Sequence, residues 1–167
     1  MTGSDDHNPR ELPPLIAGEA AATWPDLAGK MEAGGHRLPV RVYYEDTDFS
    51  GFVYHVSYLR WCERGRTDFV RHIGLGQKDL FDGEGEDRRF FVVRRMEVDY
   101  LKPALMDDVL EVRTEVDSLG ACTVDLNQVI VRDETPLFRA VVTIVLLGGA
   151  GRPQRLTAAM KAVFQPS

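Results

Sequence analysis

Cysteine, long apolar runs and excess positive charge are all scarce in this sequence. Cys62 and Cys122 form no motif with each other or with the four histidines, so we expect free thiols in a reducing cytoplasm. No apolar run approaches the roughly 20 residues that span a membrane, and the N-terminus lacks the basic start and apolar centre of a secretory signal. The net charge of −6 argues against nonspecific nucleic-acid binding. We therefore expect a cytoplasmic protein with no cofactor, no metal, no nucleic-acid partner and no stable membrane insertion.

The sequence has instead the composition of one folded domain, with 44% hydrophobic and 28% charged residues in 167. Residues 1–37 are rich in Pro, Gly, Ala and Asp and show little periodicity, which predicts a flexible N-terminal extension. We expect deletion of residues 1–35 to leave stability and turnover nearly unchanged. Residues 38–150 form the predicted domain, and residues 151–167 a C-terminal tail.

Hydrophobic periodicity predicts the order of elements in that domain. Residues 38–44 indicate a strand, 55–72 an amphipathic helix and 77–81 a short second helix. Alternation with period two then predicts four strands, within 89–101, 109–118, 121–131 and 136–147. Their short connections favour an antiparallel meander, and one polar face per strand predicts a sheet covered by the long helix on one side.

Two residues on the apolar face of the predicted helix are unusual. Gly65 costs about 1 kcal/mol in a helix interior relative to alanine, but it allows the sheet to approach closely. Arg66 needs a partner, because an unpaired buried charge is expensive. That partner is either Glu63, one turn earlier, or a carboxylate of the acidic segment that precedes the helix.

This acidic segment, "YEDTDFSGFVYH" at 44–55, has three interpretations. Asp46, Asp48, Ser50 and Gly51 match the start of an EF-hand calcium loop, but Ser57 stands where the bidentate glutamate belongs. "DTDFS" after an apolar strand is similar to the first motif of haloacid-dehalogenase phosphatases, but the rest of the chain lacks alternating strands and helices and the later motifs. Both interpretations are weak.

The third interpretation is a strand-to-helix turn that places a carboxylate beside a helix N-terminus. Gly51 permits a tight turn, and the first N–H groups of a helix lack internal partners. With the helix dipole behind them, they polarise a carbonyl or hold an oxyanion. A nearby carboxylate attacks that carbonyl or activates water towards it. This interpretation predicts a hydrolytic site within twelve residues.

The segments "RVYYEDTDFSGFVYHVSYLRWCERGRTDFVR" and "FVVRRMEVDYLKPALMDDVLEVRTEV" resemble the hotdog-fold acyl-CoA thioesterases of the 4-hydroxybenzoyl-CoA type, and among them the Tol-Pal-associated thioesterases. The resemblance covers about 39–147. It implies an α+β hotdog fold, a five-stranded antiparallel sheet wrapped around one long helix. It also implies subunits that pair into a homodimer or, more often, a homotetramer, with active sites between them.

The resemblance also implies roles for individual residues. Asp48 corresponds to the catalytic aspartate, and the helix N-terminal amide near His55 to the group that activates the thioester carbonyl. Gly51, Tyr54, Tyr58 and Phe49 are expected at the substrate. Relatives commonly have a small residue in place of Phe49 and "ERAR" in place of "ERGR". Phe49 therefore bears on acyl preference rather than on the chemistry.

The predicted function is hydrolysis of an acyl-CoA thioester, or of acyl carried on acyl carrier protein, to free acid and thiol. Asp48 acts either as nucleophile, through a mixed anhydride, or as general base for water. The alternatives are a noncatalytic module that binds CoA esters or a partner, and a dehydratase, whose different His/Asp arrangement is not found. Glu63 is a second candidate catalyst, because another hotdog branch uses a helix carboxylate, although a salt bridge is the expected role. Arg94, Arg95 and Lys102 either meet the CoA phosphates or form a solvated strand face.

Overall fold

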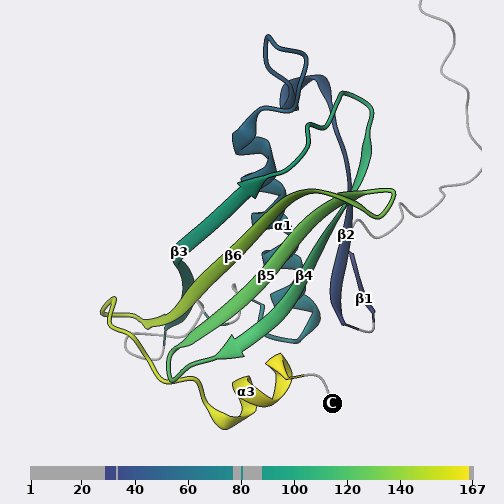
Figure 1. Ribbon diagram of the computed structural model, residues 1–167. Coiled ribbons are helices and arrows are strands. Elements are labelled where there is room, and N and C mark those ends of the chain that lie inside the picture. Colours follow the sequence, from purple (N-terminus) through teal and green to yellow (C-terminus); the bar gives the residue numbers. More distant parts are fainter. Residues whose placement is uncertain (1–28, 33, 77–79, 81–87, 166–167) are drawn as a thin grey trace, which may run out of the picture.

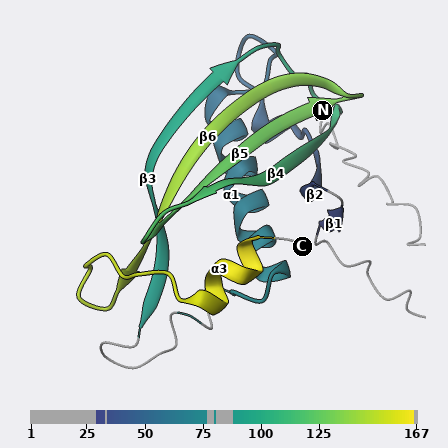
Figure 2. The ribbon, with the colours of Figure 1, turned by 60° about the horizontal axis from the view of Figure 1, so that its bottom comes forward.

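The computed structural model of this protein describes residues 29–32, 34–76, 80 and 88–165. One antiparallel sheet curves around the long helix α1 (Figures 1 and 2), as predicted. The predicted second helix at 77–81 falls almost wholly outside the described residues. The elements are β1 Lys30–Glu32, β2 Gly35–Arg41, a 3-10 turn Tyr44–Asp46, α1 His55–His72, β3 Arg89–Tyr100, β4 Val109–Leu119, β5 Thr123–Arg132, β6 Thr135–Gly148 and α3 Ala158–Phe164.

The strand order is β1-β2-β4-β5-β6-β3, and it corrects the predicted meander. Strands β4, β5 and β6 do follow one another, but β3 pairs with β6 and not with β4. The connection from β3 to β4 therefore passes over two intervening strands. It runs by the N-terminal end of α1, where Phe52 bridges to Leu105. The sheet has six strands rather than five because of the three-residue β1.

Both ends of the described chain contain more structure than predicted. The first domain strand begins at Gly35 instead of residue 38, and β1 lies in residues assigned to the extension. In the predicted C-terminal tail, α3 crosses the end of the molecule beneath α1 (Figure 2). Its Met160 and Phe164 are buried, and Phe164 packs against Phe69 of α1 and Phe91 of β3. The tail thus contributes to the core.

The core lies between α1 and the concave face of the sheet. Gly65 is needed there, because a Cβ atom at this position would lie 2.9 Å from Val112 Cγ1 of β4. Trp61 and Phe69 are buried on the same side of α1. Asp68, a charged residue of the same helix, is also buried, because β2 covers that flank of the helix.

Arg66 finds its partners inside this layer. Its guanidinium donates to Glu63 and, at 2.7 Å, to Gln128 Oε1 of β5. Glu63 was one of the two predicted partners, and the acidic segment was the other. The Gln128 amide donates in turn to the Cys62 carbonyl and to Thr114 Oγ1. The buried charge is therefore held by a satisfied network.

Both cysteines are free thiols, as predicted. Burial raises the pKa of Cys62 to about 12, so this thiol stays protonated and unreactive near neutral pH. Among the described residues, no helix combines the length and the apolar character that crossing a membrane requires.

Candidate active site

The chain between β2 and α1 folds into a compact turn that is tied to itself by hydrogen bonds. The buried Asp46 carboxylate accepts from the Tyr43 N–H at 3.0 Å, and the Asp46 carbonyl accepts from the Tyr54 N–H at 2.7 Å. Thr47 and Val53 form an antiparallel bridge. These contacts give Asp46 a structural role in the turn and fix where α1 begins.

Asp48 lies in the loop that this bridge closes. Its N–H donates to the Phe52 carbonyl at 3.0 Å, and its own carbonyl accepts from the Gly51 N–H at 3.0 Å. Gly51 has φ +80°, a left-handed conformation that glycine adopts without steric cost. The loop therefore holds the Asp48 side chain on the surface, in the turn that leads into α1.

The two carboxylate oxygens of Asp48 differ in their surroundings. Oδ1 accepts from the Ser50 N–H at 2.8 Å and from the Ser50 hydroxyl, whereas Oδ2 has no hydrogen bond within the described chain. The hydroxyl and the N–H of Ser50 lower the pKa of Asp48, and the nearby His55 lowers it further. Asp48 is therefore an ionised carboxylate with one free oxygen.

His55 is the first residue of α1. Its N–H has no acceptor in the part of the chain that the structure describes, as expected at a helix N-terminus. The Tyr100 hydroxyl, at the end of β3, donates to the His55 carbonyl at 3.1 Å. The His55 ring lies edge-on to Tyr54, with 4.4 Å between ring centroids, and to Tyr100 at 6.3 Å. Two aromatic side chains thus hold this histidine in place.

A cavity of about 280 Å³ opens beside His55. Its other lining residues are Val53, Tyr58, Tyr100, Leu101, Lys102 and Pro103. Tyr58 is buried, accepts from the Ala104 N–H at 3.0 Å and stacks on Phe138. Burial raises its pKa, so its hydroxyl is neutral. The walls are therefore mostly apolar, with the single cation of Lys102.

The predicted residues are only partly brought together. His55 and Tyr58 line the cavity, and Tyr54 packs on the His55 ring. Asp48, Phe49 and Gly51 lie on the preceding loop, outside the lining, and Phe49 is fully exposed. A larger groove of about 570 Å³ between β2 and α1 contains neither Asp48 nor His55, so we do not assign it to the site.

Two residues that support the candidate site were not identified from the sequence. Ser50 holds Asp48, and the spacing Asp-x-Ser-Gly is the local signal of such a turn. Tyr100 reaches the start of α1 from 45 residues away, and no local pattern indicates that contact. Glu63, the alternative catalyst, accepts from Arg66 and Thr67, as expected of a salt-bridged residue.

Comparison with known proteins places this chain in a family. A model described as "Thioesterase-like superfamily" matches residues 42–166. The chain belongs to this superfamily. It is 44% identical over 110 residues to the acyl-CoA thioester hydrolase YbgC of Escherichia coli, a match that covers 66% of this chain and 79% of that protein.

Other relatives extend the match. The acyl-CoA thioesterase YbgC of Haemophilus influenzae is 37% identical over 135 residues, or 80% of this chain and 97% of the relative. A crystal structure of a probable thioesterase from Bartonella henselae superposes with a TM-score of 0.70 at 42% identity and covers 74% of this chain and 99% of its own. The predicted family and hotdog fold are confirmed.

Proposed function

We propose that this protein hydrolyses acyl-CoA thioesters, with Asp48 acting on the substrate and the His55 N–H polarising the thioester carbonyl. The observation that carries the proposal is a carboxylate with one free oxygen in the turn that leads into an 18-residue helix, near enough to the first residue of that helix, His55, for His55 to lower its pKa, in a chain of the thioesterase-like superfamily. Acyl groups carried on acyl carrier protein present the same thioester and belong to the same proposal.

The helix terminus supplies the electrophilic half of the reaction. As the carbonyl carbon becomes tetrahedral, its oxygen gains negative charge, which a preorganised N–H at a helix N-terminus stabilises. Losing one such donor typically costs about 100-fold or more in rate. The Tyr100 contact to the His55 carbonyl and the Asp46 contact to the Tyr54 N–H hold this first turn in position.

Asp48 supplies the other half by one of two routes. As nucleophile, its Oδ2 bonds to the carbonyl carbon, the CoA thiolate leaves, and water hydrolyses the resulting mixed anhydride. As general base, Asp48 removes a proton from water while the water oxygen attacks, and the thiol leaves. Both routes give a free acid and a thiol, and in both the Ser50 contacts keep the carboxylate ionised and oriented.

The cavity beside His55 is the proposed site for the group next to the thioester. Its apolar walls suit an acyl chain or the pantetheine arm, and Lys102 at its edge suits an anionic group. Phe49 is exposed beside Asp48. We propose that it contacts the acyl group and contributes to acyl preference.

The test is a panel of acyl-CoAs of different chain lengths and an aromatic acyl-CoA, with thiol release as the readout. Asp48→Asn preserves size but removes both nucleophile and base, so turnover should fall at least about 100-fold with little change in substrate binding. Asp46→Asn is the matched control. Its carboxylate caps the turn, so its effect should fall on stability, with a milder effect on rate.

Other outcomes would identify a different mechanism or function. Near-normal turnover in Asp48→Asn together with inactivity in Glu63→Gln would show that the catalytic carboxylate is Glu63 of α1. If the unsubstituted protein binds CoA esters without releasing thiol from any of them, the noncatalytic binding module is the correct interpretation.

A further inference from the structure

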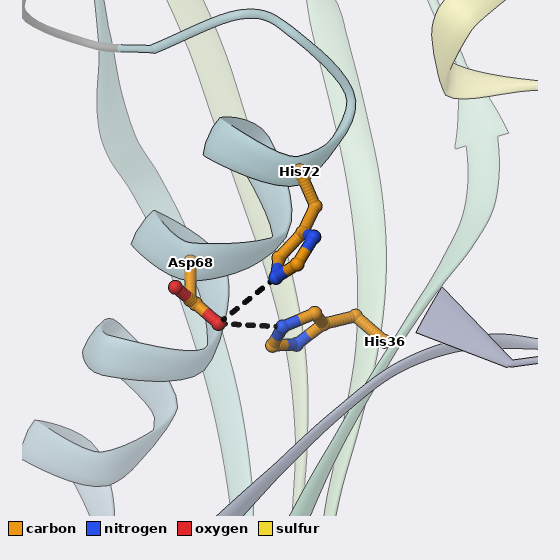
Figure 3. A group of neighbouring side chains, drawn as sticks. All are labelled: His36, Asp68 and His72. Carbon is orange, nitrogen blue, oxygen red and sulfur yellow. Dashed lines mark hydrogen bonds and ion pairs between the residues drawn. The ribbon is translucent and has the colours of Figure 1, made fainter. Parts of the chain in front are cut away.

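At the opposite end of α1 from Asp48, a second group of titratable side chains is brought together. His36 of β2 and Asp68 and His72 of α1 each direct one ligand atom to a common point, and these three atoms lie within 4.8 Å of one another (Figure 3). His36 Nε2 lies 2.8 Å from Asp68 Oδ2, and His72 Nε2 lies 3.6 Å from the same oxygen. The catalytic proposal uses none of these residues.

We propose that His36, Asp68 and His72 bind a divalent transition-metal ion of the zinc type. Two imidazole nitrogens and one carboxylate oxygen form a ligand set that zinc accepts. Asp68 and His72 are four residues apart, so the helix presents both on one face, and His36 approaches from the strand. The ligand atoms of a tetrahedral Zn²⁺ ion lie about 3.4 Å apart. The His36–Asp68 pair at 2.8 Å would therefore separate by about 0.6 Å, and no pair would approach by more than about 1.4 Å.

Burial favours an ion rather than a chance meeting of side chains. His36 is 1% exposed and Asp68 5% exposed, so neither has water to solvate it. The His72 side chain is 30% exposed, so the ion would enter on this side, and solvent there would supply the fourth ligand. The sequence predicted no metal, and it did not single out these three residues, which are separated by 32 and 4 positions.

The surroundings of Asp68 resemble the outer contacts of a ligating carboxylate. Its Oδ1 accepts from Arg71 at 2.9 Å, and its Oδ2 accepts from the Gly29 N–H at 2.6 Å. Such contacts orient a metal-bound carboxylate. Gly29 is required here, because a Cβ atom would lie 2.6 Å from His36 Nε2. The ion would join the strands before α1 to the last turn of the helix, a structural role separate from hydrolysis.

Another explanation is a hydrogen-bonded cluster without metal, in which His36 Nε2–H donates to Asp68. Within the described chain, the buried His36 Nδ1 has no partner, so His36 bonds only through Nε2 in either case. The two explanations differ over His72. In the hydrogen-bonded cluster, His72 lies too far from Asp68 for a hydrogen bond and contributes little. In the metal site it is one of three ligands.

The experiment uses the full chain, stripped with a chelator and titrated with Co²⁺ and with Zn²⁺. We expect one equivalent of Co²⁺ to bind with the visible absorption of a four-coordinate site, and Zn²⁺ to displace it and raise the unfolding temperature. His72→Gln should weaken Co²⁺ binding at least about 10-fold and abolish the Zn²⁺-dependent rise. Because His72 is partly exposed, this variant is expected to fold.

His55→Gln and His7→Gln are the matched controls, since they remove the other two histidines of the chain and should leave Co²⁺ binding intact. Absence of binding to the unsubstituted protein at about 100 μM metal would overturn the proposal. Binding that persists in His72→Gln, or that disappears in His55→Gln, would overturn it as well.

Discussion

At the scale of single residues, the two oxygens of the Asp48 carboxylate illustrate how a turn would prepare the proposed catalyst. Oδ1 is held by Ser50, and Oδ2 is the oxygen that we propose acts on the substrate. The same contacts lower the pKa of Asp48, so the turn sets both the direction and the charge of the carboxylate. Ser50 thereby sets the pH range in which the Asp48 carboxylate is ionised.

The lowered pKa of Asp48 predicts the acid limb of the pH profile. A carboxylate with a lowered pKa is active above that pKa and loses activity only as the pH falls through it, here below the ordinary value of about 3.9. We expect kcat/KM to show no loss from Asp48 protonation between pH 7 and pH 5. In Ser50→Ala the pKa rises, so the limb should move to higher pH, with kcat/KM profiles as the measurement. A limb in the unsubstituted protein centred above pH 5 would assign the titrating group elsewhere.

At the scale of elements, the sequence predicts local structure well and distant contacts poorly. The bounds of α1 match the predicted 55–72, because helical periodicity and its N-terminal turn are encoded within neighbouring residues. The pairing of β3 with β6 depends on the whole sheet, so alternation alone suggested the wrong neighbour. Tyr100 at His55 and the burial of Asp68 were missed for the same reason.

The C-terminal helix α3 gives a prediction on stability. Phe164 is fully buried against α1 and β3, so Phe164→Ala should lower the free energy of unfolding by about 3–5 kcal/mol. Val163, its neighbour in the same helix, is 41% exposed, and Val163→Ala should change it by less than about 1 kcal/mol. Denaturant unfolding measures both. Equal effects would show that α3 does not belong to the core in solution.

Strand β1 modifies the expectation for N-terminal deletions. Removing residues 1–35 deletes β1 and the Gly29 N–H bound to the buried Asp68, so we now expect a loss of about 1–3 kcal/mol in unfolding free energy. Removing residues 1–28 preserves both and should change stability and turnover little. Thermal unfolding of the two deletion variants and of the full chain measures this difference. Equal melting temperatures for the two deletion variants would contradict the expectation that only the longer deletion is destabilising.

At the scale of the whole molecule, β3 forms one edge of the sheet. Its Val93, Val98 and Tyr100 are exposed apolar or aromatic residues, and an open edge with such residues is a surface for pairing with another strand. We retain the prediction that the protein forms at least a homodimer, and we favour a homotetramer. Sedimentation at micromolar concentration checks it, and a single species of 18.7 kDa would contradict it.

The position of β3 at the edge of the sheet, next to β6, also has a consequence for biosynthesis. Tyr100 supports the start of α1, but within the described sheet β3 pairs with β6 alone, and β6 ends at Gly148. On the ribosome, the Asp48 turn and α1 emerge early, whereas β3 has no partner strand in this sheet until β6 has been made. The growing chain therefore carries the Asp48 carboxylate long before it carries the complete cavity, so the proposed hydrolysis begins only after β6 has emerged.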